Sequence, residues 1–444
     1  MGVKIIDKLM YIGLTIMVIL SFYLTYLIWL TPASKSSALL NNIEKDESSE
    51  VKNYKNTEDI FLPLNLTRFK KEATTQTNSE SLIKQGQAMV KENKYDRFTL
   101  DSFDSEDEFF EATTVKEGIE MAFADAFPIQ SYLALLQKKV SFDSSINEES
   151  FAFNRIQIDY KQKIIRFLNP LKLEFIEAEI TSNFPEEESI YNDSSDNWHT
   201  VSNAISQKEG IEFYSESPLE LTVYSYISST RPYTVFRDAF FTNPKDIRSS
   251  DDTEDLKFYD GSESLLIQQE QQRMNFQGII SADQQFDIYK KSYDYIRGLG
   301  TNFGSLRLFD RKENVINYRI FVEGFPVFGE NSEGVIRVGF SDGGQDYQKN
   351  VSIQASLNTI QVPIPSEQKV ELPAASTVLE NLEKLGIDEK DRPRLLIGYT
   401  WRNLEDTEVV DLKPGWYINY KGTWYLYDQL VAELKEEGGS DNGL

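Results

Sequence analysis

The chain contains no cysteine and a single histidine among its 444 residues. The absence of cysteine excludes disulfides, thiol catalysis, thiolate zinc sites and a lipid anchor on cysteine. With His199 as the one imidazole, no site that needs two histidines can form, such as the paired ligands of a zinc-protease helix. Much of hydrolytic and redox enzymology is therefore excluded before any motif is considered.

Basic residues are also scarce, with 46 Lys and Arg against 71 Asp and Glu and a formal net charge of -25. Phosphate binding needs clustered Lys and Arg, so the balance argues against a nucleic-acid partner. The same sign repels anionic lipid headgroups. The 28 Phe and 23 Tyr argue against a wholly disordered chain, and the length suffices for two or three domains.

One long apolar run decides the predicted location. Residues 9–30, LMYIGLTIMVILSFYLTYLIWL, carry no charge and span ~33 Å as a helix, enough for a hydrocarbon core of ~30 Å. Lys4 and Lys8 precede the run and the next charge is Lys35, so the positive-inside rule places residues 1–8 in the cytoplasm and the rest outside. A cleavable signal peptide is the alternative, but its apolar core is usually ~7–15 residues. We therefore predict a single-pass protein of the cell membrane.

The predicted membrane helix carries an interaction signal. Gly13, Met17, Ser21 and Thr25 recur at every fourth position, and Ser21 with Thr25 forms a small-xxx-small pair. Such faces let helix backbones approach closely, with interhelical hydrogen bonds worth about 1 kcal/mol or less each. We predict a partner-binding face here, although apolar runs of this length also contain such spacing by chance.

The remainder is predicted to be α+β, with antiparallel sheets and packed helices in three extracytoplasmic domains after the membrane helix. A polar stalk covers residues 31–57, and an acidic, Asn- and Ser-rich run, Pro185–Asn197, separates the first domain from the second. The predicted domains are 58–195, 196–310 and 311–434, and the polar tail 435–444 is predicted to be disordered.

Local patterns predict several elements inside these domains. Ile119, Met121 and Phe123 alternate with smaller or polar residues, which is typical of a half-buried strand. Residues 153–167 read as a hairpin, and Asp260-Gly261 marks a second hairpin turn. Helices are predicted at 235–241, ended by Asn243-Pro244, and at 376–385, ended by Gly386.

Two patterns point weakly to nucleophilic catalysis. Ser81 and Lys84 match the SxxK pattern of penicillin-recognising enzymes, but those enzymes also need SxN and a later KTG. The chain has Lys421-Gly422-Thr423 instead, which is the wrong order. No GxSxG accompanies His199, so we interpret that residue as a surface or capping histidine and Ser81 as part of a solvated turn.

The remaining motifs favour no chemistry. The acidic runs 101–108 and 251–255 lack the glycine and closing glutamate of an EF-hand loop. Gly298-Leu299-Gly300 followed by Gly304 lacks the spacing of a phosphate-binding loop. With 71 acidic residues, no carboxylate pair of a glycosidase can be singled out. We predict no catalytic residue, no cofactor site and no metal site.

Several motifs in order give the chain a resemblance to the YycH regulatory proteins of Gram-positive bacteria. They begin with the short N-terminus and anchor. They continue, in sequence, with LTYLIW (24–29), DIFLP (59–63), FRDAFFTNP (236–244), FYDG (258–261), YRIFVEGFPVF (318–328), IGY (397–399) and PGWY (414–417). The resemblance covers almost the whole chain, and the departures lie mainly in residues 70–107.

The resemblance implies a non-enzymatic role. Proteins of this family sit outside the membrane, have three extracytoplasmic domains, and associate with the YycG (WalK) sensor histidine kinase and a single-pass protein, YycI, to tune control of cell-wall metabolism. The alternative is a surface-anchored wall-binding module or a wall glycan hydrolase. A wall-binding module would expose an aromatic strip such as Trp416, Tyr417, Trp424 and Tyr425. For a regulator of this family we expect the same aromatics to lie mostly in the core or at a protein interface.

Overall fold

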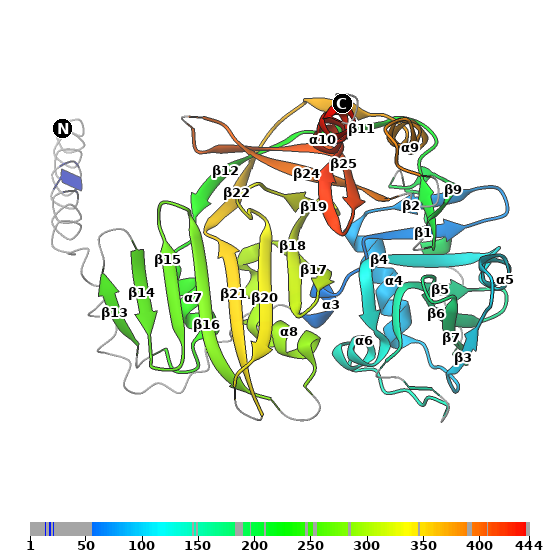
Figure 1. The fold of residues 1–444 in the computed structure, drawn as a ribbon, viewed down its shortest axis with the longest axis horizontal. Coiled ribbons are helices and arrows are strands. Elements are labelled where there is room, and N and C mark those ends of the chain that lie inside the picture. Colours follow the sequence, from blue (N-terminus) through cyan, green and yellow to red (C-terminus); the bar gives the residue numbers. More distant parts are fainter. Residues whose placement is uncertain are drawn as a thin grey trace, which may run out of the picture. The chain divides into compact units, whose positions relative to one another are not determined.

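Figure 1 shows the chain as a computed structural model. Its contacts divide it into residues 1–52 and residues 53–444, and each unit is described by itself. The structure describes residues 14, 17, 18 and 21 of the first unit, and residues 56–440 of the second except 144–145, 148–149, 183–189, 196, 208–209, 245–246, 252–254, 283–285, 345–346, 389–392 and 406.

The N-terminal part of the second unit is an eight-stranded sheet of order β3-β7-β6-β5-β4-β1-β2-β8, in which every paired strand is antiparallel. Its elements are α3 (Thr57–Ile60), β1 (Asn65–Phe69), β2 (Thr74–Thr77), α4 (Glu80–Glu92), β3 (Thr99–Ser102), α5 (Glu106–Ala112), β4 (Gly118–Pro128), α6 (Ile129–Leu135), β5 (Ala152–Asp159), β6 (Ile164–Asn169), β7 (Glu174–Glu179), η1 (Ile190–Asn192) and β8 (His199–Thr200).

Both faces of this sheet are covered. Helices α4 and α6 pack on one face, beside β1 and β4. On the other face, Phe109 of α5 packs against Leu168 and Phe175. The alternation around 119–123 therefore predicts the strand β4 correctly but its environment wrongly, because Glu120, expected at the solvent, is 4% exposed.

The rest of the second unit is built on a fourteen-stranded sheet of order β13-β14-β15-β16-β21-β20-β18-β19-β24-β25-β12-β22, with β17 added to β18 and β26 added to β25. Its strands are β12 (Tyr224–Thr230), β13 (Arg248–Asp251), β14 (Asp255–Tyr259), β15 (Ser264–Gln268), β16 (Arg273–Ser281), β17 (Ser305–Lys312), β18 (Val315–Val322), β19 (Phe325–Phe328), β20 (Val335–Asp342), β21 (Gln348–Ser356), β22 (Asn358–Ile364), β24 (Arg394–Asn403), β25 (Val409–Tyr420) and β26 (Thr423–Leu426).

Within the described residues, two short ladders and four α-helices complete this part. The ladders pair β9 (Ser202–Gln207) with β10 (Gly210–Tyr214), and β11 (Leu219–Thr222) with β23 (Lys369–Leu372). The helices are α7 (Tyr233–Phe240), α8 (Ile288–Gly298), which is followed by η2 (Gly300–Phe303), α9 (Ala375–Lys384) and α10 (Tyr427–Ser440). Helices α7 and α8 lie on one face of the strands between β14 and β18 (Figure 1), where Phe236, Phe240 and Phe276 form part of the core.

The large sheet joins the two regions predicted as 196–310 and 311–434. Its two antiparallel halves meet where β19 runs parallel to β24. Residue 310 lies inside β17, and β12, from the earlier region, pairs with β22 and β25 from the later one. At the second predicted boundary, near residue 310, the chain therefore runs within one sheet, and strands from both sides of the boundary pair with each other.

Most of the local predictions are confirmed. The hairpins around 153–167 and 260–261 are β5–β6 and β14–β15, and the helices predicted at 235–241 and 376–385 are α7 and α9. The tail is a correction. Helix α10 continues through 435–440, which were predicted to be disordered; this region has Glu and Lys, which are good helix formers, before its glycines.

At Gly324 the β18–β19 turn comes very close to the backbone of the N-terminal part. Its φ is +82°, and an added Cβ would lie 1.9 Å from the backbone oxygen of Asn78, which precedes α4. Gly261, in the β14–β15 turn, has a similar φ of +95° but nothing within 4 Å of such a Cβ.

We predict that Gly261→Ala lowers the free energy of unfolding by about 1 kcal/mol. Gly324→Ala should lower it by ~1–3 kcal/mol more than Gly261→Ala does, because its Cβ also meets the backbone of Asn78. Denaturant unfolding of the full-length chain measures both, and equal losses would contradict the close approach.

Candidate functional site

The predicted helix face lies mostly outside the described residues. Gly13 and Thr25 are not described, whereas Met17 and Ser21 are helical and exposed. Residues four apart lie on the same side of a helix, so these two share a face. In the part of the chain that the structure describes, no helix is long and apolar enough to cross a membrane. The face therefore stays a prediction.

The SxxK pattern does not assemble a catalytic pair. Ser81 is exposed on α4, and its Oγ lies 3.0 Å from the Oγ of Ser79. The Nζ of Lys84 lies instead 2.7 Å from Asp59 and 2.9 Å from Glu80. A lysine held by two carboxylates is a charged structural group, so it does not act as the base for Ser81.

His199 lies in strand β8, opposite Gln76 of β2, and is half-buried. It lies in a two-residue strand at the end of the sheet and keeps part of its side chain exposed, so its interpretation as a surface residue is not contradicted. Burial lowers the pKa of its imidazole. It lines a hollow of about 530 Å³ between the start of α4 and the β18–β19 turn, where the hydroxyl of Ser305 already donates to Glu80.

The acidic run 101–108 has a structural use. Ser105 accepts a hydrogen bond from the Glu108 N–H and caps α5, and Glu106, Asp107 and Glu108 occupy the first helical turn. Carboxylates there are stabilised by the partial positive charge of a helix N-terminus. Within the described residues no group of three or more Asp, Glu or His is placed to hold a metal ion.

The aromatic strip proposed for a wall-binding module is not exposed. Trp416 and Tyr417 are each 4% exposed, and Trp424 and Tyr425 are partly buried against the two C-terminal hydrophobic clusters. The ring of Tyr417 stacks on Phe328 with centroids 3.8 Å apart. Trp416 and Tyr417 are core residues, whereas Trp424 and Tyr425 pack at the edge of the core and stay partly exposed.

The junction between the two sheets holds buried charge. Arg394, at the start of β24, is 5% exposed. Its guanidinium donates to the backbone oxygens of Ala124 at 2.6 Å and Phe123 at 2.7 Å, both in β4, and its Nε lies 3.0 Å from the Glu212 carboxylate. One arginine thus connects the N-terminal sheet, β10 and the large sheet.

The Glu212 carboxylate extends this network into the N-terminal sheet. Arg155 of β5 lies 2.7 Å from Glu212 and donates to Glu120 of β4 at 2.6 Å. Gln157 also donates to Glu120, at 2.8 Å. Two carboxylates and two guanidiniums balance one another, which is the condition under which buried charges are tolerated.

A second buried arginine holds the opposite side of the junction. Arg307 of β17 is fully buried, and its guanidinium donates to Glu80 at 2.9 Å and to the backbone oxygen of Pro63 at 3.2 Å. Its Cζ also lies 4.4 Å from the centre of the Phe321 ring. Burial alone would raise the pKa of Glu80, but hydrogen bonds from Lys84 and Ser305 and the charge of Arg307 lower it to about 2.

A hollow of about 390 Å³ opens above the first network. Four phenylalanines form part of its wall, and Glu120, Arg155 and Gln157 form its polar floor. The phenylalanines are Phe69, Phe109, Phe110 and Phe213. The Oε1 of Gln157 is buried without a hydrogen-bond partner, so the floor offers one free acceptor.

The lining of this hollow includes one carboxylate, Glu120, whereas a glycosidase uses a pair. Such an enzyme needs one carboxyl group with a raised pKa as general acid. Burial would raise the pKa of Glu212, but the charges of Arg155 and Arg394 outweigh it, and the pKa is lowered. Glu212 is therefore an anion fixed between two cations.

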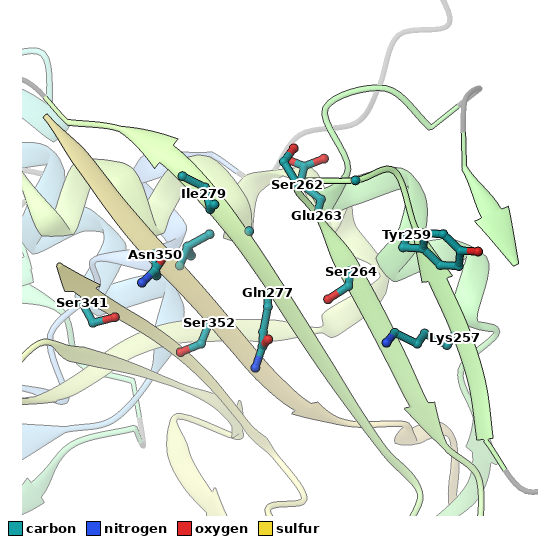
Figure 2. A pocket seen from close by; sticks show the side chains of 13 residues that line it. Lys257, Tyr259, Ser262, Glu263, Ser264, Gln277, Ile279, Ser341, Asn350 and Ser352 are labelled. Atoms are coloured by element: carbon teal, nitrogen blue, oxygen red, sulfur yellow. The ribbon is translucent and has the colours of Figure 1, made fainter. Parts of the chain in front are cut away.

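The largest of these hollows, about 700 Å³, lies on the large sheet on the face opposite α7 and α8. It extends over β14, β15, β16, β21 and β20. Figure 2 shows its lining, which is mostly polar: Ser264, Gln277, Ser352, Asn350 and Ser341 project from successive strands, with Lys257 and Tyr259 at one side. It is an open groove on a sheet and is suited to an extended ligand.

Comparisons with known proteins agree on one family. The family described as YycH protein, N-terminal domain, matches residues 9–166, and YycH protein, C-terminal domain, matches residues 211–431. The chain belongs to the YycH family. The resemblance drawn from its sequence motifs is thereby confirmed.

A solved structure shows the same fold. The crystal structure of YycH from Bacillus subtilis aligns with a TM-score of 0.65 and 17% sequence identity, over 85% of this chain and 98% of that one. No curated protein matches the chain. The mixed α+β class with antiparallel sheets is thus confirmed.

Sequence patterns missed the charged residues of the junction. Arg155 and Gln157 alternate with apolar residues in β5 and were interpreted only as part of a hairpin, and Arg394 was interpreted only as the start of a strand. A charged residue inside a strand pattern normally indicates a solvent face. Their position inside strand patterns was the one signal available from the sequence. The segments that bury these side chains lie up to 271 positions away in the chain, so the pattern did not reveal their burial.

We predict that Arg394→Met lowers the free energy of unfolding by about 3–5 kcal/mol, because it removes one partner of a buried charge network. Lys369→Met is the control: its pair with Glu220 is exposed, and such pairs contribute no more than about 1 kcal/mol. Denaturant unfolding of the full-length variants measures both values. A loss for Arg394→Met as small as that for the control would contradict the role of the junction.

The lowered pKa of Glu80 predicts a pH dependence. A carboxyl group with a depressed pKa in the folded state stabilises the protein above its unfolded value of 4.5, and this stabilisation is lost as the pH falls towards about 2. Glu80→Gln should therefore show a shallower loss of stability than the parent chain between pH 4.5 and 2. Thermal melts across this range test it, and parallel curves for the two proteins would contradict it.

Proposed function

We propose that the chain is a membrane-anchored extracytoplasmic regulator of the YycFG two-component system. In this proposal it associates with the YycG (WalK) sensor histidine kinase and a YycI-like single-pass partner, and tunes control of cell-wall metabolism. The observation that carries the proposal is membership of the YycH family over residues 9–166 and 211–431.

The sequence supports the membrane anchor in this proposal. The family match begins at residue 9, the first residue of the apolar run. The flanking lysines orient the run with residues 1–8 in the cytoplasm, which leaves the acidic bulk of the chain outside.

The bonds at the junction of the two sheets support a proposed role of the ectodomain in transmitting a load to the anchor. One hydrophobic cluster extends through both sheets, and buried arginines on β17 and β24 bond to the N-terminal part. An ectodomain linked in this way moves as one piece. A load applied to it is passed to the anchor, and a differential contact of about 1–3 kcal/mol between anchor and kinase helices shifts a two-state equilibrium several-fold or more.

The alternatives have less support. A wall hydrolase needs a pair of carboxyl groups in its site, whereas Glu120 is the one carboxylate among the residues that line the Phe-walled hollow, and it accepts from Arg155 and Gln157. A wall-binding module built on Trp416, Tyr417, Trp424 and Tyr425 conflicts with their burial.

The first test is an affinity pull-down with the full-length membrane protein beside the same chain lacking residues 1–30. We expect full-length bait to recover a sensor kinase and a second single-pass protein, and the truncated bait to recover neither, because the proposed contact lies in the anchor. Recovery by both baits would move the contact to the ectodomain. Recovery of no kinase by either bait would overturn the proposal.

The second test addresses the helix face of Gly13, Met17, Ser21 and Thr25. Gly13→Leu combined with Ser21→Leu enlarges this face and should reduce kinase recovery severalfold. Thr15→Leu with Ile19→Leu is the matched control, because these positions lie about 160° around a helix from that face. Equal recovery with the two double variants would contradict the assignment of the face.

A further inference from the structure

Four basic residues share the groove face of the large sheet. Residues directly opposite one another in paired strands project from the same face. In the strand register Arg248 pairs with Tyr259, and Tyr259 pairs with Ser264. The same row continues across the sheet, since Ser264 pairs with Gln277 and Gln277 with Ser352. The same alternation places Lys257, Arg273 and Arg337 on this face. We call the outward face of β13–β16, β21 and β20 the polar face.

The charge of the polar face is opposite to that of the chain. The four cations face one carboxylate, Asp255, within the described residues of these strands, whereas the whole chain has a net charge of -25. None of the four forms an ion pair in the described part of the chain. Glu263 lines the groove at the β14–β15 turn, but its carboxylate accepts from the N–H and hydroxyl of Thr242.

Two of the cations lie close enough to repel each other. Burial lowers the pKa of Arg337, and the charge of Arg273 lowers it further. Arg337 donates to the hydroxyl of Ser332 at 2.9 Å, and the Nε of Arg273 is buried without an acceptor. The charge of Asp310 on β17 raises the pKa of Arg337 and so partly offsets these effects, and its carboxylate accepts from Asn317. An anion bound between the two guanidiniums would remove the repulsion and supply the missing acceptor.

The neutral residues of the polar face narrow the class of anion. Ser264, Gln277, Ser352 and Asn350 offer hydroxyl and amide groups in adjacent positions (Figure 2), and such groups both donate to and accept from hydroxyls. The strands beneath the groove, β14, β15, β16, β21 and β20, are paired on both sides, so their backbone is not free to bind a peptide by strand addition. From β14 to β20 the face measures ~19 Å, at ~4.8 Å per strand.

We propose that the polar face binds an acidic polysaccharide, an extended glycan whose carboxylates contact Arg273, Arg337 and Lys257. Its hydroxyl groups bond to Ser264, Gln277 and Ser352, and a sugar ring lies against Tyr259. This site goes beyond the proposed role in the YycFG system. It concerns the isolated chain, so failure of the kinase pull-down would leave it standing.

The test is titration of the full-length chain with an oligogalacturonate, with a maltooligosaccharide of equal length and with polyglutamate as the other probes. We expect binding of the oligogalacturonate that weakens with added salt, and at least tenfold weaker binding of the other two. Equal affinity for polyglutamate would show that charge alone is recognised and would overturn the proposal. Absence of oligogalacturonate binding would also overturn it.

Charge-matched variants locate the site. Arg273→Gln with Arg337→Gln should weaken oligogalacturonate binding at least tenfold. Lys349→Gln with Lys369→Gln removes the same charge from residues outside the polar face, which pair with Asp342 and Glu220, and should change it less than twofold. Lys257→Gln, at an exposed side chain, should cause a severalfold loss and serves if the arginine variant fails to fold. Equal effects of the two double variants, or none for Lys257→Gln, would contradict the site.

Discussion

The fold of the second unit depends on charge buried between its two sheets. Arg394 and Arg307 would each be costly to bury alone, since an unpaired cation loses its hydration. Each is instead surrounded by acceptors from the N-terminal part: the backbone of β4 and Glu212 for Arg394, and Pro63 and Glu80 for Arg307. These bonds form only when both sheets are in place, so the charges favour one relative placement of the sheets over other ways of covering the same apolar surface.

Apolar packing supplies the driving force for bringing the two sheets together, and the bonds of the buried arginines determine how the sheets are placed. One cluster of buried residues includes Phe61 and Phe153 from the N-terminal part and Phe276 and Tyr318 from the large sheet. The ring of Phe127 lies 4.6 Å from that of Tyr289 on α8, so the core continues across the junction. Hydrophobic burial has no direction of its own, whereas the bonds of the buried arginines do.

In the described part of the large sheet between β14 and β18, the two faces differ because helices cover only one of them. Helices α7 and α8 cover one face, where apolar side chains dominate, while the other face keeps Ser, Gln and Asn side chains together with Arg and Lys side chains that form no ion pair within the described residues. In an acidic chain, a surface with excess positive charge attracts anions that the rest of the molecule repels. In the glycan-binding proposal, the anion therefore binds at the polar face and not on the acidic remainder of the chain.

The sequence by itself determined the family, the α+β class, and the elements with local signals. Helix α9 has apolar residues at helical spacing and a terminal glycine, and the β14–β15 hairpin has an Asp-Gly turn; these depend on neighbours along the chain. Tertiary structure decided which faces are covered. The cover over Glu120 comes from distant segments, which the alternation along β4 does not reveal. Strand pairing places Arg273 and Arg337 on one face of the sheet, with β21 between their strands. Alternation predicts a strand, but burial depends on what packs against it.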